Sequence, residues 1–129
     1  MKVCLDSSAY IAMRRGNRDV TAFLADCEVV IVPAAVVAEL TEGFILDKNA
    51  LAKNLELGRF LNSKNVQFHP AGYAEAIRYA EISHSLRRKG RPIPHNDIWV
   101  AATAFETGSR VLSYDHHFDE IDGLGRLAP

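Results

Sequence analysis

The sequence contains few cysteines and has no long hydrophobic run. Its two cysteines, Cys4 and Cys27, form neither a C-x-x-C pair nor the dense spacing of a disulfide scaffold, so we expect both to be reduced and buried. The longest apolar stretch, residues 29–38, contains a proline and is shorter than the ~18 to 20 residues that a membrane-spanning helix needs. The apolar start of the chain stops at Asp6, too early for a signal peptide. We therefore expect a cytoplasmic protein with no membrane partner.

The sequence also lacks an excess of charge of either sign. Fifteen Lys and Arg residues against sixteen Asp and Glu residues leave a net charge of −1, so a nucleic-acid partner would have to be bound by a local basic patch. A hydrophobic content of 48% excludes intrinsic disorder. The length of 129 residues suits one compact domain over residues 1–129.

Short apolar runs alternate along the chain with longer segments of helical period. This alternation is typical of βαβ units around a parallel sheet. It predicts a three-layer α/β/α sandwich with a parallel sheet of four to five strands, but it does not predict their order. The expected strands cover residues 3–5, 28–32, 66–68 and 110–113, with a short candidate at 126–128.

Four carboxylates stand where such a fold keeps its ligand site, beyond the carboxyl ends of the strands. Asp6 follows the first strand directly, and Asp115 lies two residues past the run ending at Ser113. Glu39 is the only charged residue between Val29 and Leu40, where burial would be costly without a partner. The fourth, Asp97, opens an apolar helix.

Carboxylates that converge in this way stay ionised only beside a compensating cation. No basic residue lies within two positions of Glu39 or Asp97. Oxygen ligands suit Mg2+ or Mn2+, and such ions support hydrolysis of a phosphodiester without a protein nucleophile. We therefore predict a metal site that is formed by Asp6, Glu39, Asp97 and Asp115.

Further residues are candidates for supporting roles. Ser7 and Ser113 place hydroxyls beside Asp6 and Asp115, where they can orient a carboxylate or a metal-bound water. Asp119 is either an additional ligand or a turn residue. A basic run upstream of Asp97 is a candidate RNA-binding patch and consists of Arg87, Arg88, Lys89 and Arg91.

Other residues have ordinary structural explanations. We expect His116 and His117 to be exposed turn residues rather than metal ligands or acid–base groups, and His84 and His95 are weaker candidates still. Trp99 and Phe105 are expected to belong to the core rather than to stack on bases. The remaining acids are expected on solvated helix faces: Asp19, Asp26, Glu42, Asp47, Glu56, Glu75, Glu81 and Glu106. A phosphoaspartate-type phosphatase is a rival class, although Ser8 stands where a dehalogenase-like phosphatase would carry its second Asp.

The ordered set of segments Leu5-Asp6-Ser7-Ser8, Val37-Ala38-Glu39-Leu40, Asn96-Asp97-Ile98-Trp99 and Leu112-Ser113-Tyr114-Asp115 resembles the PIN-domain ribonucleases, and most of all the VapC toxins of type II toxin–antitoxin modules. This resemblance implies a Mg2+- or Mn2+-dependent endoribonuclease whose acids are the four named above, with Ser113 at a position usually held by Thr or Ser. It also implies a homodimer that is inhibited by a VapB-type antitoxin and that reaches operator DNA only through it. The alternative is a catalytically weak PIN-like module that acts only within an antitoxin–DNA complex.

Overall fold

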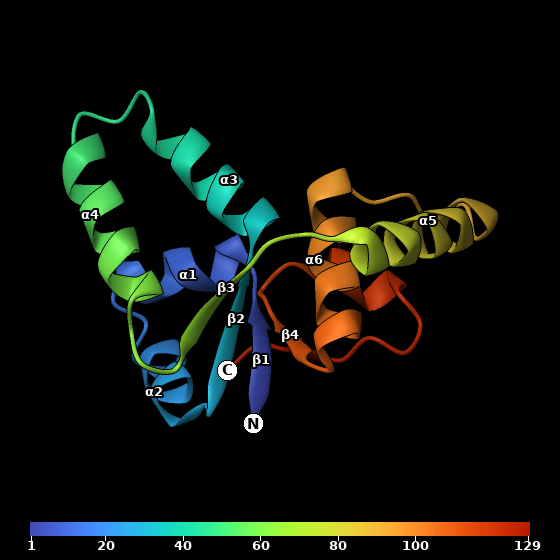
Figure 1. The fold of residues 1–129 in the computed structure, drawn as a ribbon, viewed down its shortest axis with the longest axis horizontal. Coiled ribbons are helices and arrows are strands. Elements are labelled where there is room, and N and C mark those ends of the chain that lie inside the picture. Colours follow the sequence, from blue (N-terminus) through green and yellow to red (C-terminus); the bar gives the residue numbers. More distant parts are fainter.

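A computed structural model describes residues 1–129 and has five parallel strands in the order β3-β2-β1-β4-β5 (Figure 1). The strands are β1 (Lys2–Leu5), β2 (Val29–Pro33), β3 (Val66–His69), β4 (Arg110–Leu112) and β5 (Arg126–Leu127). The helices are α1 (Ser7–Arg14), α2 (Arg18–Asp26), α3 (Ala34–Phe44), α4 (Ala50–Leu61), α5 (Tyr73–Arg88), α6 (His95–Thr107) and the short 3-10 helix η1 (His116–Glu120). The predicted parallel α/β sheet is therefore confirmed.

The three central strands form the core because their side chains are buried on both faces of the sheet. Val3, Cys4 and Leu5 of β1 are fully buried, as are Val111 and Leu112 of β4. Such continuous apolar strands are characteristic of a parallel sheet covered by helices on both sides. The two cysteines are buried and free, as predicted.

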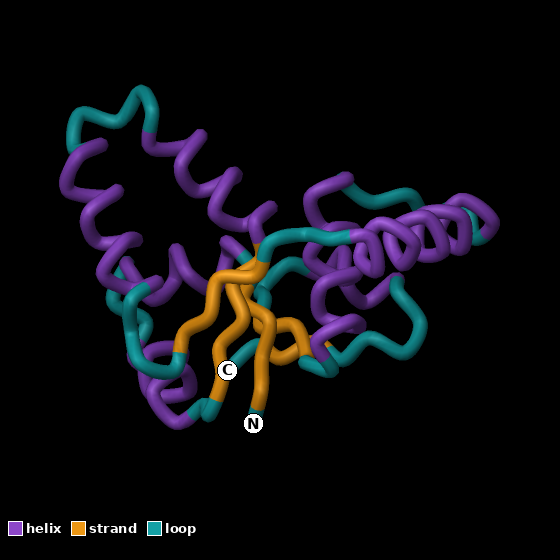
Figure 2. The backbone as a smooth tube through the Cα atoms, in the orientation of Figure 1, coloured by secondary structure: helices purple, strands orange, loops and turns teal.

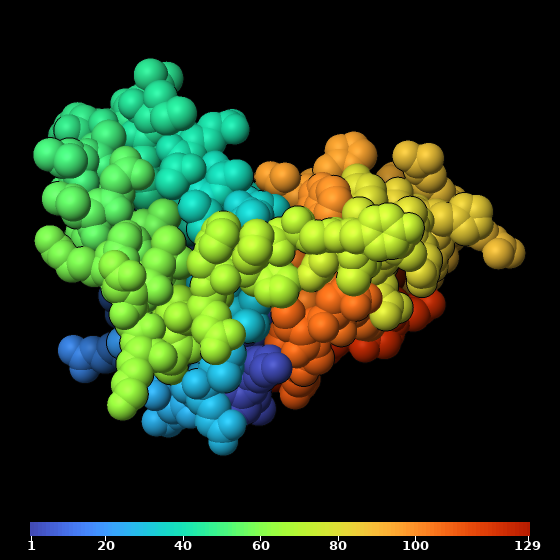
Figure 3. Space-filling model, in the orientation of Figure 1, coloured from blue at the N-terminus to red at the C-terminus, as the bar shows by residue number.

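The helices lie in two layers on opposite sides of the sheet (Figures 1 and 2). The crossovers from β1 to β2 and from β2 to β3 carry α1 to α4 on one side, whereas α5 and α6 connect β3 back to β4 on the other. In the space-filling view, an indentation separates the α3–α4 pair from α5 and α6 (Figure 3). None of the helices is both long and apolar enough to cross a bilayer.

Two local expectations are corrected by the structure. Because proline suits the first turn of a helix, the sequence places Pro33 inside the helix that follows, but Pro33 ends β2 and takes the N-cap position of α3. Glu75 is buried rather than solvated, because its side chain accepts a hydrogen bond from the Gly72 N–H at 3.1 Å and contacts His69 Nε2 at 2.6 Å. Glu75 thus closes the start of α5.

Candidate active site

Neighbouring strands bring Asp6 and Asp115 to the same edge of the sheet. β1 and β4 pair in parallel, with Leu5 opposite Leu112. The Asp6 N–H extends this pairing by donating to the Leu112 carbonyl at 3.0 Å. Because parallel strands all end at one edge, the segments that follow β1 and β4 emerge side by side. The sequence does not predict the strand order, so it is the structure that makes these two strands neighbours.

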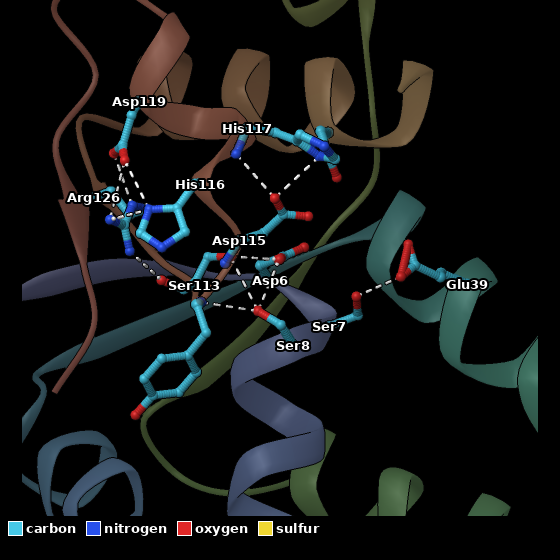
Figure 4. A network of polar contacts seen from close by, with 12 residues as sticks. Asp6, Ser7, Ser8, Glu39, Ser113, Asp115, His116, His117, Asp119 and Arg126 are labelled. Carbon is cyan, nitrogen blue, oxygen red and sulfur yellow. Dashed lines mark hydrogen bonds and ion pairs between the residues drawn. The ribbon is translucent and has the colours of Figure 1, made fainter. Parts of the chain in front are cut away.

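Asp97 reaches this edge from the first turn of α6. It is the third residue of that helix and is only 7% exposed. Its Oδ2 atom lies 2.8 Å from His117 Nδ1, and the same ring nitrogen lies 3.0 Å from Asp115 Oδ1. The ligand atoms of these three side chains lie within 4.8 Å of one another. Asp97, Asp115 and His117 are therefore the compact part of the site, and Figure 4 shows Asp115 beside His117.

The carboxylate of Asp6 is oriented by two serines. Ser113 Oγ donates to Asp6 Oδ2 at 2.7 Å, and Ser8 Oγ donates to the same oxygen at 3.1 Å. The two hydroxyls also contact each other at 3.0 Å, and Ser113 Oγ accepts from the Asp115 N–H at 2.9 Å. The network thus ties the end of β1 to the loop that carries Asp115 (Figure 4).

Glu39 approaches the site from α3 and lies next to Ser7 (Figure 4). It is exposed, so the expected cost of burying this carboxylate does not arise. Its Oε1 atom accepts a hydrogen bond of 2.5 Å from Ser7 Oγ. Ser7 therefore orients Glu39, whereas Ser8 acts together with Ser113 to hold Asp6.

Burial and nearby negative charge disfavour ionisation of Asp6 and Asp97. Burial, with smaller contributions from the charges of Asp6 and Asp115, raises the pKa of Asp97 to about 6. Burial also raises the pKa of Asp6, although its hydrogen bonds from Ser113 and Ser8 oppose this shift. The hydrogen bond to Asp97 and the nearby carboxylates raise the pKa of His117. The site therefore favours bound positive charge.

The donor set fits a divalent cation. No lysine or arginine forms an ion pair with any of the four acids. Each acid also keeps one oxygen that accepts no side-chain hydrogen bond: Asp6 Oδ1, Glu39 Oε2, Asp97 Oδ1 and Asp115 Oδ2. Hard oxygen donors with free lone pairs are what Mg2+ and Mn2+ prefer. With Pro94, His95, Asn96 and His117, three of these acids (Glu39, Asp97 and Asp115) line a cavity of about 390 Å³.

Sequence reasoning missed His117. Its position in a polar turn indicated an ordinary exposed histidine, and its side chain is indeed 48% exposed. The turn is η1, however, and Asp115 caps it by accepting from the His117 N–H at 2.9 Å. The only feature of the sequence that points to His117 is that it lies two residues after Asp115. This spacing brings the two side chains together only because residues 116–120 form the turn η1.

Asp119 and the basic run lie outside this cluster. Asp119 pairs with Arg126 at 2.8 Å and with His116 at 3.2 Å. Within the basic run, Lys89 binds Asp122 and Arg91 binds Glu120, whereas Arg87 and Arg88 form no ion pair. Half of the predicted patch is therefore engaged by acids of the C-terminal segment.

Known proteins resemble this chain in both sequence and fold. Ribonuclease VapC5 of Mycobacterium tuberculosis is 26% identical over 123 residues, which cover 95% of this chain and 90% of that protein. The structure of VapBC2 from Rickettsia felis bound to a promoter DNA fragment superposes with a TM-score of 0.86 at 20% identity, over 98% of both chains. FitAcB from Neisseria gonorrhoeae gives a TM-score of 0.80 at 28% identity, over 98% of this chain and 97% of that one.

The family match covers almost the whole chain and includes all four acids. Residues 3–124 match the PIN domain family. The matched region begins in β1, just before Asp6, and extends past η1, so it contains every strand end that carries a candidate ligand. The sequence match, the strand order and the acidic edge agree, and the chain belongs to the PIN domain family.

Proposed function

We propose that this protein is a cytoplasmic, divalent-metal-dependent endoribonuclease that hydrolyses RNA phosphodiester bonds. The observation that carries the proposal is the convergence of Asp6, Asp97 and Asp115 at one sheet edge without a lysine or arginine partner. The similarity to a protein named as a ribonuclease supports RNA as the substrate.

In this proposal Asp6, Glu39, Asp97 and Asp115 hold Mg2+ or Mn2+ through their free oxygens. A bound divalent ion supplies an activated water at neutral pH and neutralises charge on the attacked phosphate. Ser113 and Ser8 fix the rotamer of Asp6, which leaves its Oδ1 directed to the ligand.

The peripheral residues have secondary roles in the proposal. Ser7 positions Glu39, and His117 neutralises part of the charge on Asp97 and Asp115, so it competes with a cation for the same carboxylates. Asp119 acts on the loop after β4 through Arg126 rather than as a ligand. From the basic run, Arg87, Arg88, Lys89 and Arg91 are proposed to guide the RNA strand.

We also propose that the protein forms a homodimer and is inhibited by a VapB-type antitoxin, with operator DNA contacted only through that antitoxin. Structures of related complexes support a protein partner. So do large apolar side chains that face water in the loop between α3 and α4 and on α4, where Leu46 (loop) is 96% and Leu51 (α4) is 76% exposed.

Cleavage of total cellular RNA by the purified, antitoxin-free protein tests the activity. We expect discrete new 5′ ends with Mg2+ or Mn2+, none with chelator, and none with Asp97→Asn. Asp26→Asn is the matched control. Asp26 is exposed at the end of α2, so this variant should cleave like wild type. Cleavage that survives chelation, or equal cleavage by Asp97→Asn, would refute the proposal, and folded protein that cleaves nothing would favour a binding module.

A further inference from the structure

Three aromatic side chains stack beside the acidic site. The rings of Tyr79 and Trp99 lie 4.6 Å apart between centroids, with an interplanar angle of 34°. The rings of Tyr79 and His95 lie 6.2 Å apart and within 17° of parallel, and the Tyr79 hydroxyl is hydrogen-bonded to His95 Nδ1. We call these three residues the aromatic stack. Trp99 is half-buried and lies outside the hydrophobic core, so the expectation that it is a core residue is wrong.

His95 is the exposed end of this stack, and it lies between two cavities. The first is the acidic cavity, which His95 lines together with Asp97 and Asp115. The second, of about 190 Å³, is lined by His95, Arg87 and the connector residues Pro92 and Ile93. A chain that leaves the acids along the surface therefore meets His95 first and Arg87 next.

The fixed orientation of His95 suits it to hold a flat ligand. One ring nitrogen is bound by Tyr79, whose own ring packs against Trp99, so the imidazole is held in place before any ligand arrives. Unpaired RNA bases stack on aromatic side chains regardless of sequence, because every base offers a π face. Paired bases in an A-form duplex do not have this face free.

Arg87 provides the complementary charge. It forms no ion pair, unlike its neighbours Lys89 and Arg91, so its guanidinium is available to a phosphate. An aromatic surface followed by a free cation is the usual arrangement for binding single-stranded nucleic acid.

We propose that His95, supported by Tyr79 and Trp99, is a nucleotide subsite that stacks an unpaired RNA base next to the scissile phosphate, with the following phosphate on Arg87. The inference rests on the proposed ribonuclease function and deepens it, because it assigns the residues that hold the substrate beside the acids. His95 and Arg87 are thus substrate-binding residues distinct from the acids.

Steady-state kinetics on a short RNA that spans a mapped cleavage site test the subsite. His95→Ala should raise KM about tenfold, the effect expected from losing one base–aromatic stack, and should change kcat less than KM. His95→Phe should restore a KM close to wild type, because a phenyl ring can also stack. Arg87→Gln should raise KM and weaken its salt dependence. Tyr73→Ala is the control, because Tyr73 is an exposed aromatic residue of α5 outside the stack.

A binding measurement separates failure of the subsite from failure of the nuclease. The probe is a single-stranded oligouridylate with one central 2-aminopurine, whose fluorescence is quenched by stacking, mixed with the Asp6→Asn protein to prevent cleavage. We expect the Asp6→Asn protein to quench the fluorescence of the single-stranded probe, and the Asp6→Asn, His95→Ala double variant not to quench it. The same probe annealed to its complement should show no further quenching with either protein. Quenching independent of His95, or an unchanged KM in an active His95→Ala enzyme, would overturn the inference, whereas the cleavage assay above judges the nuclease on its own.

Discussion

At the scale of single residues, Asp97 makes the stability of the protein depend on pH. Its pKa is raised to about 6 in the folded protein, above the 3.8 of an unperturbed Asp, so between these values the folded state binds more protons than the unfolded state. The free energy of unfolding must therefore fall as pH rises through this window. His117 acts in the same direction at higher pH, since its raised pKa means that its stabilising contribution is lost as pH rises through that pKa.

Replacing Asp97 should therefore stabilise the protein when no divalent ion is present. In chelator at neutral pH, we expect Asp97→Asn to raise the free energy of unfolding by about 1 to 2 kcal/mol and to reduce its fall between mildly acidic and neutral pH. Urea denaturation at several pH values measures this. A variant less stable than wild type at neutral pH would show that the carboxylate of Asp97 is not under the electrostatic strain described here.

Ser113 is a second residue whose effect should be visible in a pH profile. Its hydrogen bond to Asp6 Oδ2 lowers a pKa that burial raises. Ser113→Ala should therefore lower kcat about tenfold and shift the acidic limb of the kcat profile to higher pH, because Asp6 then takes up a proton more readily. Ser113→Thr keeps the hydroxyl and should restore both values. If the acidic limb of the kcat profile does not shift in Ser113→Ala, Ser113 does not influence the pKa of Asp6.

The acids were predictable at this scale because Asp6 and Asp115 follow recognisable strands and Asp97 opens an apolar helix. The fourth acid, Glu39, is the only charge in an apolar segment. The contacts of Ser7, Ser8 and His117 were not predictable, because they depend on where each side chain points. Ser7 and Ser8 are consecutive on α1, about 100° apart around the helix, so one faces Glu39 and the other faces Asp6.

At the scale of secondary structure elements, the start of α5 depends on Glu75. Its carboxylate binds the Gly72 N–H and His69 Nε2, which joins the end of β3 to the helix. Glu75→Ala removes the acceptor of the Gly72 N–H and the contact with His69, and it should cost about 1 to 2 kcal/mol of stability. Thermal denaturation tests this, with Glu81→Ala as control because Glu81 is exposed on the same helix. Equal melting temperatures for the two variants would contradict the capping role.

Elements of marginal length mark the limit of sequence prediction. The central strands were evident from unbroken apolar runs, and the helices from their period and their Gly and Pro breaks. β5 has only two residues, and it forms because the Val111 N–H donates to the Gly125 carbonyl while Arg126 binds the Ser113 carbonyl. Both bonds join segments distant in sequence, so no local pattern predicts them.

At the scale of the whole molecule, strand order determines the site. The order β3-β2-β1-β4-β5 makes β1 and β4 neighbours, which is the condition for Asp6 and Asp115 to meet. Sequence periodicity does not encode strand order, so the proximity of the acids could be stated only as conditional. The resemblance to PIN-domain proteins, rather than the periodicity, supplied that missing step.

The metal-site proposal also predicts that a bound cation stabilises the whole fold. A divalent ion that binds only the folded chain stabilises it by about 2.7 kcal/mol at one hundred times its Kd, which corresponds to a rise in melting temperature of roughly 5 to 10 °C. We expect this rise with Mn2+ or Mg2+ in wild type, and a much smaller one in Asp6→Asn and Asp97→Asn. Differential scanning calorimetry at fixed protein concentration measures it.

The pH dependence of this stabilisation identifies the protons that the cation displaces. The pKa values of Asp97 and His117 are both raised in the folded chain, so both groups hold protons there at mildly acidic pH. A cation binds only when Asp97 is ionised and His117 no longer occupies Asp97 and Asp115 as a charged partner. The rise in melting temperature should therefore grow as pH increases from mildly acidic to mildly alkaline values. Asp26→Asn should keep the full wild-type response. An equal rise in all the variants would place the bound cation away from the acidic edge, and the metal-site proposal would then fail independently of any assay with RNA.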